Sequence, residues 1–411
     1  MMGRRGGALI LQRDFDRILF LCVMALVLIG IAFVYSATVE NTQVVAPLHT
    51  RQALWALAGV IGIVVAIRLP LQFYFGASYI LFIAVMLILL ALLVVGGGEG
   101  GRWFAFSSGV RIQPSEPAKI VLVLAVARYL SGRLVNFRRA RDYLIPLGLA
   151  SIPFILVMRQ PDLGTGMIFP VIIIPMLYWK GVPLWVIFLL CTPILSVITA
   201  FAPETWGVAM FIIALVVWRK KVKPGLAILV ILVNIMLGIL TPVVWDNLHE
   251  YQQNRILTFI NPQNDPLGAG YQIIQSTVAV GSGGLTGKGY LQGTQTKLNF
   301  LPEQHTDFIY SVIAEETGML GALIVLLLFA VVLQRILKAA TEVRNTFAGL
   351  VIAGASGIMF AHIVVNIGMS LGLLPITGLP LPFISYGGSH LLSMMFLVGI
   401  VLGLRLRWME Y

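Results

Sequence analysis

The chain has 411 residues, of which 59% are hydrophobic and only 11% are charged. Soluble domains carry about 25% charged residues, so this composition excludes an ordinary soluble fold and predicts an integral membrane protein. The net charge of +11 does not favour a nucleic-acid partner, because Lys and Arg gather in the cytoplasmic loops of membrane proteins.

Apolar runs of about 20 residues, enough to cross a hydrocarbon core of about 30 Å, recur along the whole chain. The first is predicted to be a retained signal anchor, because four arginines precede it and no small-residue cleavage site follows it. We therefore predict an all-α polytopic membrane protein with a single membrane-embedded domain over residues 1–411. Hydropathy places twelve spans, at 18–38, 52–68, 74–96, 115–131, 143–158, 163–179, 183–202, 205–218, 223–245, 308–334, 346–372 and 381–404.

Charge sets the predicted orientation. Basic clusters at 133–141, 219–223, 335–344 and 405–407 all fall on the same side as the N-terminus. That side, with both termini, is predicted to be cytoplasmic. Residues 246–307 then form a large extracytoplasmic loop, and its closely spaced glycines favour tight turns and a functional role.

Ionisable residues near or inside the spans need an explanation, because burying a charge in a bilayer is costly. Glu116 and Lys119 share a helical face, so they either form an internal ion pair or point into a cavity. Asp162 is either the N-cap of the next helix or a cavity residue. Asp265 precedes a proline, which is typical of a turn residue, and catalysis is the alternative.

Candidate metal ligands are sparse. Glu303, His305 and Asp307 lie close together, but no second ligand cluster with metal spacing accompanies them, so no metal site is predicted. The other histidines are expected to be packing or interfacial residues. Cys22 and Cys191 lie inside apolar runs and are expected to be free thiols.

Four separated segments carry a resemblance. They are RIQPSEPAK from Arg111, QPDLGTG from Gln160, the stretch from Asp265 that includes DPLGAGYQ, GTQ and FLPEQHTDF, and NIGMSLGLLPITGLPLPFISYGGS from Asn366. In content and order they resemble the motifs of the shape, elongation, division and sporulation (SEDS) family. The GTQ and FLPEQHTDF motifs are most similar to those of its RodA branch. The resemblance implies the SEDS fold with a core of ten helices, so that 205–245 adds an extra hairpin.

The resemblance also implies an activity: an inverting peptidoglycan glycosyltransferase. It would polymerise lipid II into β-1,4 glycan strands at the outer face of the bacterial cytoplasmic membrane during cell elongation, releasing undecaprenyl diphosphate. Such a transfer needs a carboxylate to accept the proton of the attacking hydroxyl and positive charge to receive the diphosphate. The motif match implies that Asp265 is this base and that Arg111 and Lys119 contact the diphosphate. The implied substrate-binding residues are Arg102, Arg111, Gln113, Glu116, Lys119, Asp162, Glu303, His305, Thr306, Asp307, Ser385 and Ser389.

The implied partners are lipid II, membrane lipid, a class B penicillin-binding protein with transpeptidase activity, and the elongation machinery. The resemblance implies no specific cofactor, and whether a divalent cation (Mg²⁺ or Mn²⁺) sits at the diphosphate is left open. Two alternatives remain: a lipid II transporter, and a membrane scaffold for the penicillin-binding protein. A transporter needs polar access to both faces, whereas the unusual polar residues of this chain concentrate on the outer side.

Overall fold

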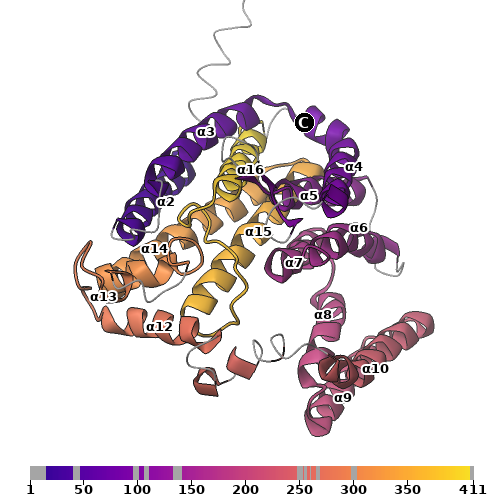
Figure 1. Cartoon of the computed structure of the whole chain (residues 1–411). Helices are drawn as coiled ribbons and strands as arrows, with labels where there is room; N and C mark the ends of the chain where they lie inside the picture. Colours follow the sequence, from indigo (N-terminus) through magenta and orange to yellow (C-terminus); the bar gives the residue numbers. More distant parts are fainter. Residues whose placement is uncertain are drawn as a thin grey trace, which may run out of the picture.

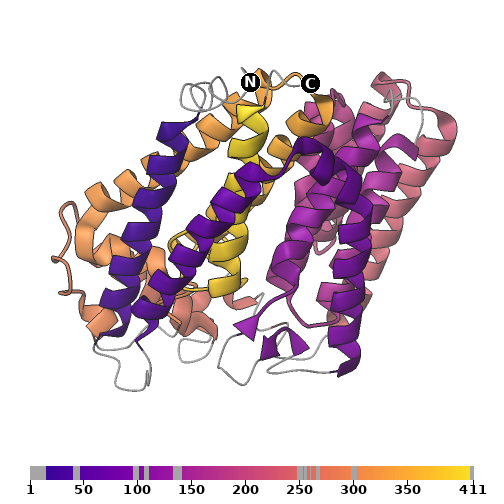
Figure 2. The same ribbon diagram turned by 90° about the horizontal axis from the view of Figure 1, so that it is seen from above.

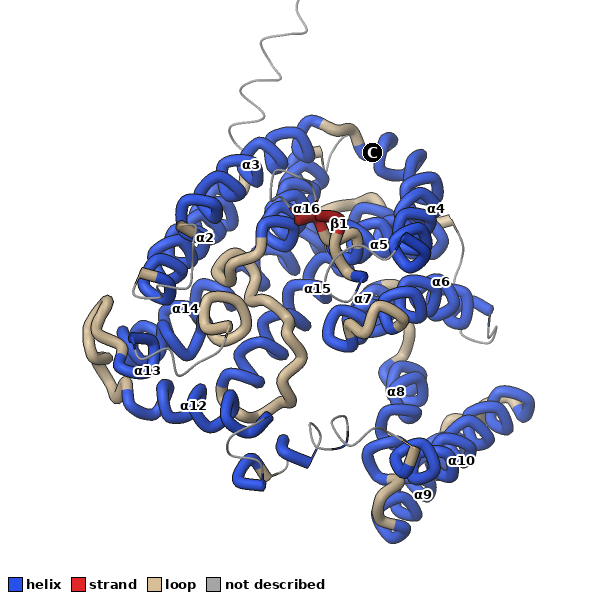
Figure 3. Tube along the Cα trace, in the orientation of Figure 1, coloured by secondary structure: helices blue, strands red, loops and turns tan. Residues whose placement is uncertain are grey.

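The computed structural model describes residues 15–39, 47–95, 101–105, 111–132, 141–247, 253, 257–259, 261–264, 269–297 and 303–407. Helices make up most of this part of the chain (Figure 3). A small antiparallel hairpin joins β1 (Phe104–Ala105) to β2 (Arg111–Ile112). The predicted all-α class is therefore confirmed.

Twelve helices of 16 residues or more occupy the positions of the twelve predicted spans. Eight of them are long and apolar enough to cross a membrane, and α7 and α8 are shorter apolar helices. The chain is thus a polytopic membrane protein. The helices are α2 (Arg17–Thr38), α3 (Leu48–Arg68), α4 (Leu71–Val95), α5 (Ser115–Ser131), α6 (Arg141–Met158), α7 (Leu163–Trp179), α8 (Leu184–Thr199), α9 (Pro203–Arg219), α10 (Pro224–Asp246), α14 (Ile309–Glu342), α15 (Thr346–Ser370) and α16 (Gly388–Leu406).

Helix α15 forms the centre of the bundle. It packs against α5, α7, α14 and α16 (Figure 1), and 83% of its most apolar window is buried inside the protein. Helix α16 packs closely on α3, where a Cβ at Gly399 would lie only 2.8 Å from the Cα of Ile63. Small residues allow helix backbones to approach in this way, which gives packing contacts that lipid cannot replace.

Helices α9 and α10 form the hairpin predicted at 205–245. They pack on α8 at one edge of the bundle (Figure 1), and only 11% of the most apolar 18-residue stretch of α10 is buried inside the protein. A polar contact joins α8 to α10: Ser196 Oγ donates to Asn234 Oδ1 (2.6 Å), and Asn234 Nδ2 donates to Thr192 Oγ1 (3.0 Å). Buried polar groups in a bilayer need such partners, so this network fixes the hairpin to α8.

Helix α14 is interrupted at Gly318, whose backbone (φ 68°, ψ −167°) is not helical. Residues 283–289, in the loop that precedes α14, fill the interruption. The N–H groups of Lys288 and Gly289 donate to the carbonyls of residues 315 and 316 (3.1 and 2.9 Å), and the N–H groups of residues 319 and 320 donate back to the loop. Irregular backbone at this depth is tolerated where protein satisfies its hydrogen bonds.

The predicted outer loop contains regular structure of its own. Its described residues include the 3₁₀ turn η2 (Pro262–Asn264), α12 (Ala269–Ser282) and α13 (Thr294–Lys297). Asp265, the predicted base, lies outside the described residues.

The first turn of α2 and the last turn of α16 lie at the same end of the bundle, and the β hairpin lies at the opposite end (Figure 2). The predicted start of the last span was wrong: α16 begins at Gly388, and residues 371–387 are non-helical although much of the segment is buried. Pro380 and Pro382 have no N–H to give to a helix, which explains why apolar composition alone misplaced the boundary.

Candidate functional site

Three of the predicted motifs meet at the end of the bundle that carries the β hairpin. The backbone N–H of Gln113, just after β2, donates to Ser389 Oγ (3.2 Å), and this hydroxyl donates to the carbonyl of Arg111 (3.2 Å). The side-chain amide of Gln113 donates to Asp162 Oδ2 (3.1 Å). The start of α16 and the start of α7 are therefore both tied to the segment that carries Arg111, whose side chain is exposed.

Asp162 has the capping role that the sequence allowed, and it also binds a second motif. Its Oδ1 accepts from the N–H of Thr165 (3.1 Å), so it is the N-cap of α7, and its other oxygen binds Gln113. Arg102 lies beside this turn. Its guanidinium donates to the carbonyl of Gln160 (2.9 Å) and to that of Pro161, so in this structure it satisfies carbonyls at the end of α6.

Residues 303–307 are fixed to the segment between α15 and α16. Ser385 Oγ donates to the carbonyl of Thr306 (2.6 Å), and the N–H of Tyr386 donates to the carbonyl of His305 (2.9 Å). The side-chain amide of Asn366 donates to the carbonyl of Asp307 (3.0 Å). The fourth motif thus joins the same end of the bundle through backbone carbonyls, while the Glu303 side chain is 64% exposed.

The electrostatics of Asp307 connect this segment with Asp162. Burial, followed by the negative charge of Glu303, raises the pKa of Asp307 to about 6; Asp162 adds to the rise, and a hydrogen bond with Thr306 opposes it. Burial also lowers the pKa of His305, against the opposing effect of Glu303. Asp307 and Asp162 therefore lie close enough to repel one another when both are ionised.

Glu116 and Lys119 form an ion pair, as one of the two sequence hypotheses held. Lys119 Nζ lies 2.7 Å from Glu116 Oε1 and 3.0 Å from His362 Nε2 of α15. Glu116 Oε2 lies 2.9 Å from His390 Nδ1 of α16. All four side chains are buried, with 4% exposure or less. The two histidines, expected to be packing or interfacial residues, are instead hydrogen-bond partners of the pair.

Comparison with known proteins gives the same assignment as the motifs. The family of cell cycle proteins that comprises FtsW, RodA and SpoVE matches residues 16–206 and 204–407. The chain belongs to this family. MrdB of Escherichia coli K12, a peptidoglycan glycosyltransferase, is 35% identical over 392 residues, which cover 95% of this chain and 93% of MrdB.

Two further similar proteins support this family assignment. The peptidoglycan glycosyltransferase RodA of Treponema pallidum is 32% identical, covering 96% of this chain and 98% of its own. A solved structure of a peptidoglycan synthase complex that coordinates polymerization and crosslinking contains a chain with 30% identity and a TM-score of 0.73, which matches 97% of this chain and 100% of that one. The present chain is thus a peptidoglycan glycosyltransferase of the SEDS family.

The sequence motifs did not assign a role to Glu315, which in this structure anchors residues 288–295 to α14. Its Oε1 accepts from Lys288 Nζ (2.7 Å) and from the N–H groups of Thr294 and Gln295 (2.9 and 3.0 Å). The neighbouring Glu316 accepts from Ser36 of α2. Two adjacent acidic residues inside an apolar helix were the available signal, because such charges require partners.

The part of the chain that the structure describes contains no group of three or more His, Cys, Asp or Glu side chains that could hold a metal ion. Among the twelve predicted substrate-binding residues, the structure brings together Arg111, Gln113, Asp162 and Ser389 around one set of hydrogen bonds, and Ser385 with Thr306 in another.

Proposed function

We propose that this chain polymerises lipid II into β-1,4 glycan strands during cell elongation, with release of undecaprenyl diphosphate. The observation that supports it best is the meeting of four separated motifs at one end of the bundle, opposite the ends of α2 and α16. With the termini in the cytoplasm, as the basic clusters favour, this end faces outward from the cytoplasmic membrane. Lipid II presents its sugars and peptide at that surface.

The proposed chemistry is an inverting transfer. The Asp265 carboxylate takes the proton from the attacking sugar hydroxyl, the hydroxyl oxygen bonds to the anomeric carbon of the second precursor, and the diphosphate leaves. Residues 246–307 supply this base and act as the catalytic loop of a single membrane domain. Arg111, which is exposed, binds the departing diphosphate, because a guanidinium matches the geometry of phosphate oxygens.

Lys119 is placed differently from Arg111. It is buried, and two of its three N–H groups are directed to Glu116 and His362, which leaves one for a phosphate oxygen. We propose that it adds a second positive charge beneath Arg111. Gln113, Asp162, Ser385 and Ser389 shape the surrounding surface, and Glu303, His305, Thr306 and Asp307 line its other side.

A partner is proposed as well. The related chain was solved in a complex that coordinates polymerization and crosslinking. We propose that a class B penicillin-binding protein cross-links the strands that this chain produces, and that the elongation machinery positions both. The apolar α9–α10 hairpin has no assigned part in this interaction.

The test is glycan polymerisation by purified protein, with and without the penicillin-binding protein, supplied with labelled lipid II in detergent. Asp265→Ala is expected to reduce the polymer yield by about 10²- to 10⁴-fold, the range for loss of a general base. Glu204→Ala, in the first turn of α9 and outside residues 246–307, is the matched control and should polymerise normally. The same assay with EDTA, and with added Mg²⁺ or Mn²⁺, decides whether a divalent cation takes part.

The transporter alternative makes the opposite prediction. Lipid II would move across liposome membranes in the presence of the protein, at the same rate in wild type and in Asp265→Ala, and no polymer would form. A scaffold would show neither polymerisation nor movement, yet would still raise the transpeptidase activity of its partner.

A further inference from the structure

The buried ion pair of α5 is the centre of a longer polar chain. Its order is His362, Lys119, Glu116, His390, and it joins three helices through contacts of 3.0, 2.7 and 2.9 Å. Both histidines lie just outside the motifs that carry the family resemblance. A chain of four ionisable groups with 4% exposure or less is costly unless each contact has the correct donor and acceptor.

The partners of His362 determine its tautomer. The Lys119 ammonium can only donate, so His362 Nε2 must accept. The carbonyl of Pro380 can only accept, and it lies 3.1 Å from His362 Nδ1, so this nitrogen must carry the hydrogen. The Pro380 contact requires a hydrogen on Nδ1, and the Lys119 contact requires Nε2 to be free of one, so together the two contacts require a neutral imidazole protonated at Nδ1. A second proton, on Nε2, would set two donors against each other.

His390 faces the other end of the pair. Its Nδ1 lies 2.9 Å from a carboxylate oxygen of Glu116, so Nδ1 donates. Its Nε2 is buried, and no residue in the described part of the chain gives it a hydrogen-bond partner. The contact at Nδ1 therefore carries the polar function of this side chain. It holds one carboxylate oxygen away from Lys119, which leaves the other oxygen as the single acceptor for the ammonium.

We infer that His362 and His390 are positioning residues, which fix the direction of the remaining N–H group of Lys119 and so place its charge for the leaving diphosphate. An ammonium is tetrahedral, so once Glu116 and His362 take two of its N–H groups, the third can point in only one direction. This inference rests on the proposed function, and it deepens the role of Lys119 within it.

The neighbouring contacts connect this chain to the proposed site. Ser389, the residue before His390, binds the carbonyl of Arg111 and the N–H of Gln113. The first turn of α16 thus contacts both the strand that carries Arg111 and the carboxylate that holds Lys119. The charged and titratable groups that face the two imidazoles are Glu116, Lys119 and, for each ring, the other imidazole, whose centroids are 4.7 Å apart.

Substitution by Asn or by Gln tests the two ring nitrogens of each histidine separately, because the two amide side chains differ in length. The Asn amide reaches the position of Nδ1, and the Gln amide reaches the position of Nε2. His362→Gln keeps an acceptor for Lys119, whereas His362→Asn keeps only the contact with Pro380. His390→Asn keeps a donor for Glu116, whereas His390→Gln places its amide at the unpartnered position. Within each pair, both variants lose the same imidazole packing.

The measurement is the initial rate of glycan formation from labelled lipid II by the full-length protein, with the melting temperature recorded for each variant. We expect His362→Gln and His390→Asn to stay within roughly threefold of wild type, because their hydrogen bonds are kept. His362→Asn and His390→Gln should lose about 10- to 100-fold in kcat at similar melting temperatures, as expected when a group shifts by about 1 Å. Equal activity of the Asn and Gln variants at either position would overturn the inference.

Wild type that makes no polymer contradicts the proposed function, whereas active wild type with four equal variants contradicts only this inference.

Discussion

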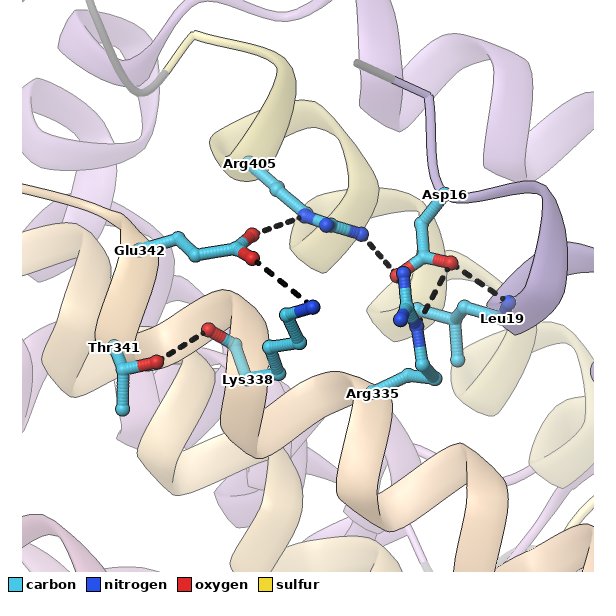
Figure 4. Close-up of polar contacts among 7 residues, drawn as sticks. All are labelled: Asp16, Leu19, Arg335, Lys338, Thr341, Glu342 and Arg405. Atoms are coloured by element: carbon cyan, nitrogen blue, oxygen red, sulfur yellow. Dashed lines mark hydrogen bonds and ion pairs between the residues drawn. The ribbon is translucent and has the colours of Figure 1, made fainter.

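Two polar clusters hold α16, one at each end, and they differ in how far water can reach them. At the end that carries the β hairpin lies the chain of Glu116, Lys119, His362 and His390, here called the hairpin-end cluster. At the other end, Asp16 before α2 binds Arg335 of α14 (2.9 Å) and Arg405 of α16, and Arg405 binds Glu342 (2.7 Å; Figure 4). Each cluster joins three helices, so both fix the position of α16 within the bundle.

The environments of the two clusters are unlike. The side chains of Lys119 and Glu116 are 1% and 2% exposed. In the Asp16 cluster Asp16 is fully buried, but Arg335 is 19% and Glu342 is 34% exposed. A long, partly exposed side chain can turn to water when it loses its partner, whereas one inside the bundle cannot. The loss of one partner should therefore cost far more in the hairpin-end cluster.

Removing the carboxylate of the buried pair is the strongest test of this difference. Glu116→Gln leaves Lys119 without its counter-charge, and we expect the free energy of unfolding to fall by about 3–5 kcal/mol. SDS-induced unfolding in mixed micelles measures the change. The double variant Glu116→Gln/Lys119→Met removes both charges and should recover most of this stability without recovering polymerisation. A single-variant loss below about 1 kcal/mol would show that water reaches the pair.

Removing Asp16 should have a smaller effect. Asp16→Ala deletes the N-cap of α2, whose side chain accepts from the N–H of Leu19 (3.0 Å), together with two ion pairs. We expect a loss of about 1–2 kcal/mol, the range for a cap combined with partly exposed ion pairs.

Asp16→Asn is the matched control, because it keeps the cap and loses only the charge. Its deficit relative to wild type should shrink in about 1 M salt, where the Debye length is about 3 Å. A deficit as large as that of Glu116→Gln would contradict the comparison between the two ends.

The smallest expected effect concerns Asp307, which lies near Asp162 and Glu303. Its pKa is raised from 3.8 to about 6 in the folded protein. A raised pKa stabilises the fold where the carboxyl is protonated, and this contribution is lost as the pH rises through about 6. Asp307→Asn lacks this dependence. Its melting temperature should gain about 1–2 °C on wild type between pH 5 and pH 8, because the Asp307 carboxyl changes the free energy of unfolding by about 1.4 kcal/mol over that interval and the unfolding entropy of a chain this long is about 0.9 kcal/mol/K. Asp307→Glu keeps a carboxyl group and should follow the wild type.

The helices were the most predictable part of the molecule, because a membrane span is a continuous apolar run in the sequence. The run that forms α5 was placed at the same residues, 115–131, in sequence and structure. The exceptions have physical causes. Residues 381–387 are apolar but belong to a proline-rich, non-helical segment. Helix α14 extends to Glu342, beyond the predicted end of its span, because its last residues are polar and hydropathy detects only the apolar part of a helix.

The candidate site was only partly predictable. The spacing of Glu116 and Lys119 was enough to suggest an ion pair, because it lies within one helix. The partners His362 and His390 are 243 and 274 residues away in the chain. No local sequence pattern predicts a contact between residues so far apart in the chain. Asp162 shows a related limit: its cap was visible in the sequence, whereas its bond to Gln113 depends on how α5 and α7 pack.

The interruption of α14 at Gly318 has a consequence for biogenesis. The carbonyls of residues 315 and 316 find their donors in residues 288 and 289, which precede α14 in the chain and emerge from the ribosome earlier. This span therefore cannot reach its final hydrogen bonding as an isolated segment leaving the translocon. Insertion of α14 and docking of the preceding residues are expected to be completed together, as a single late step of assembly.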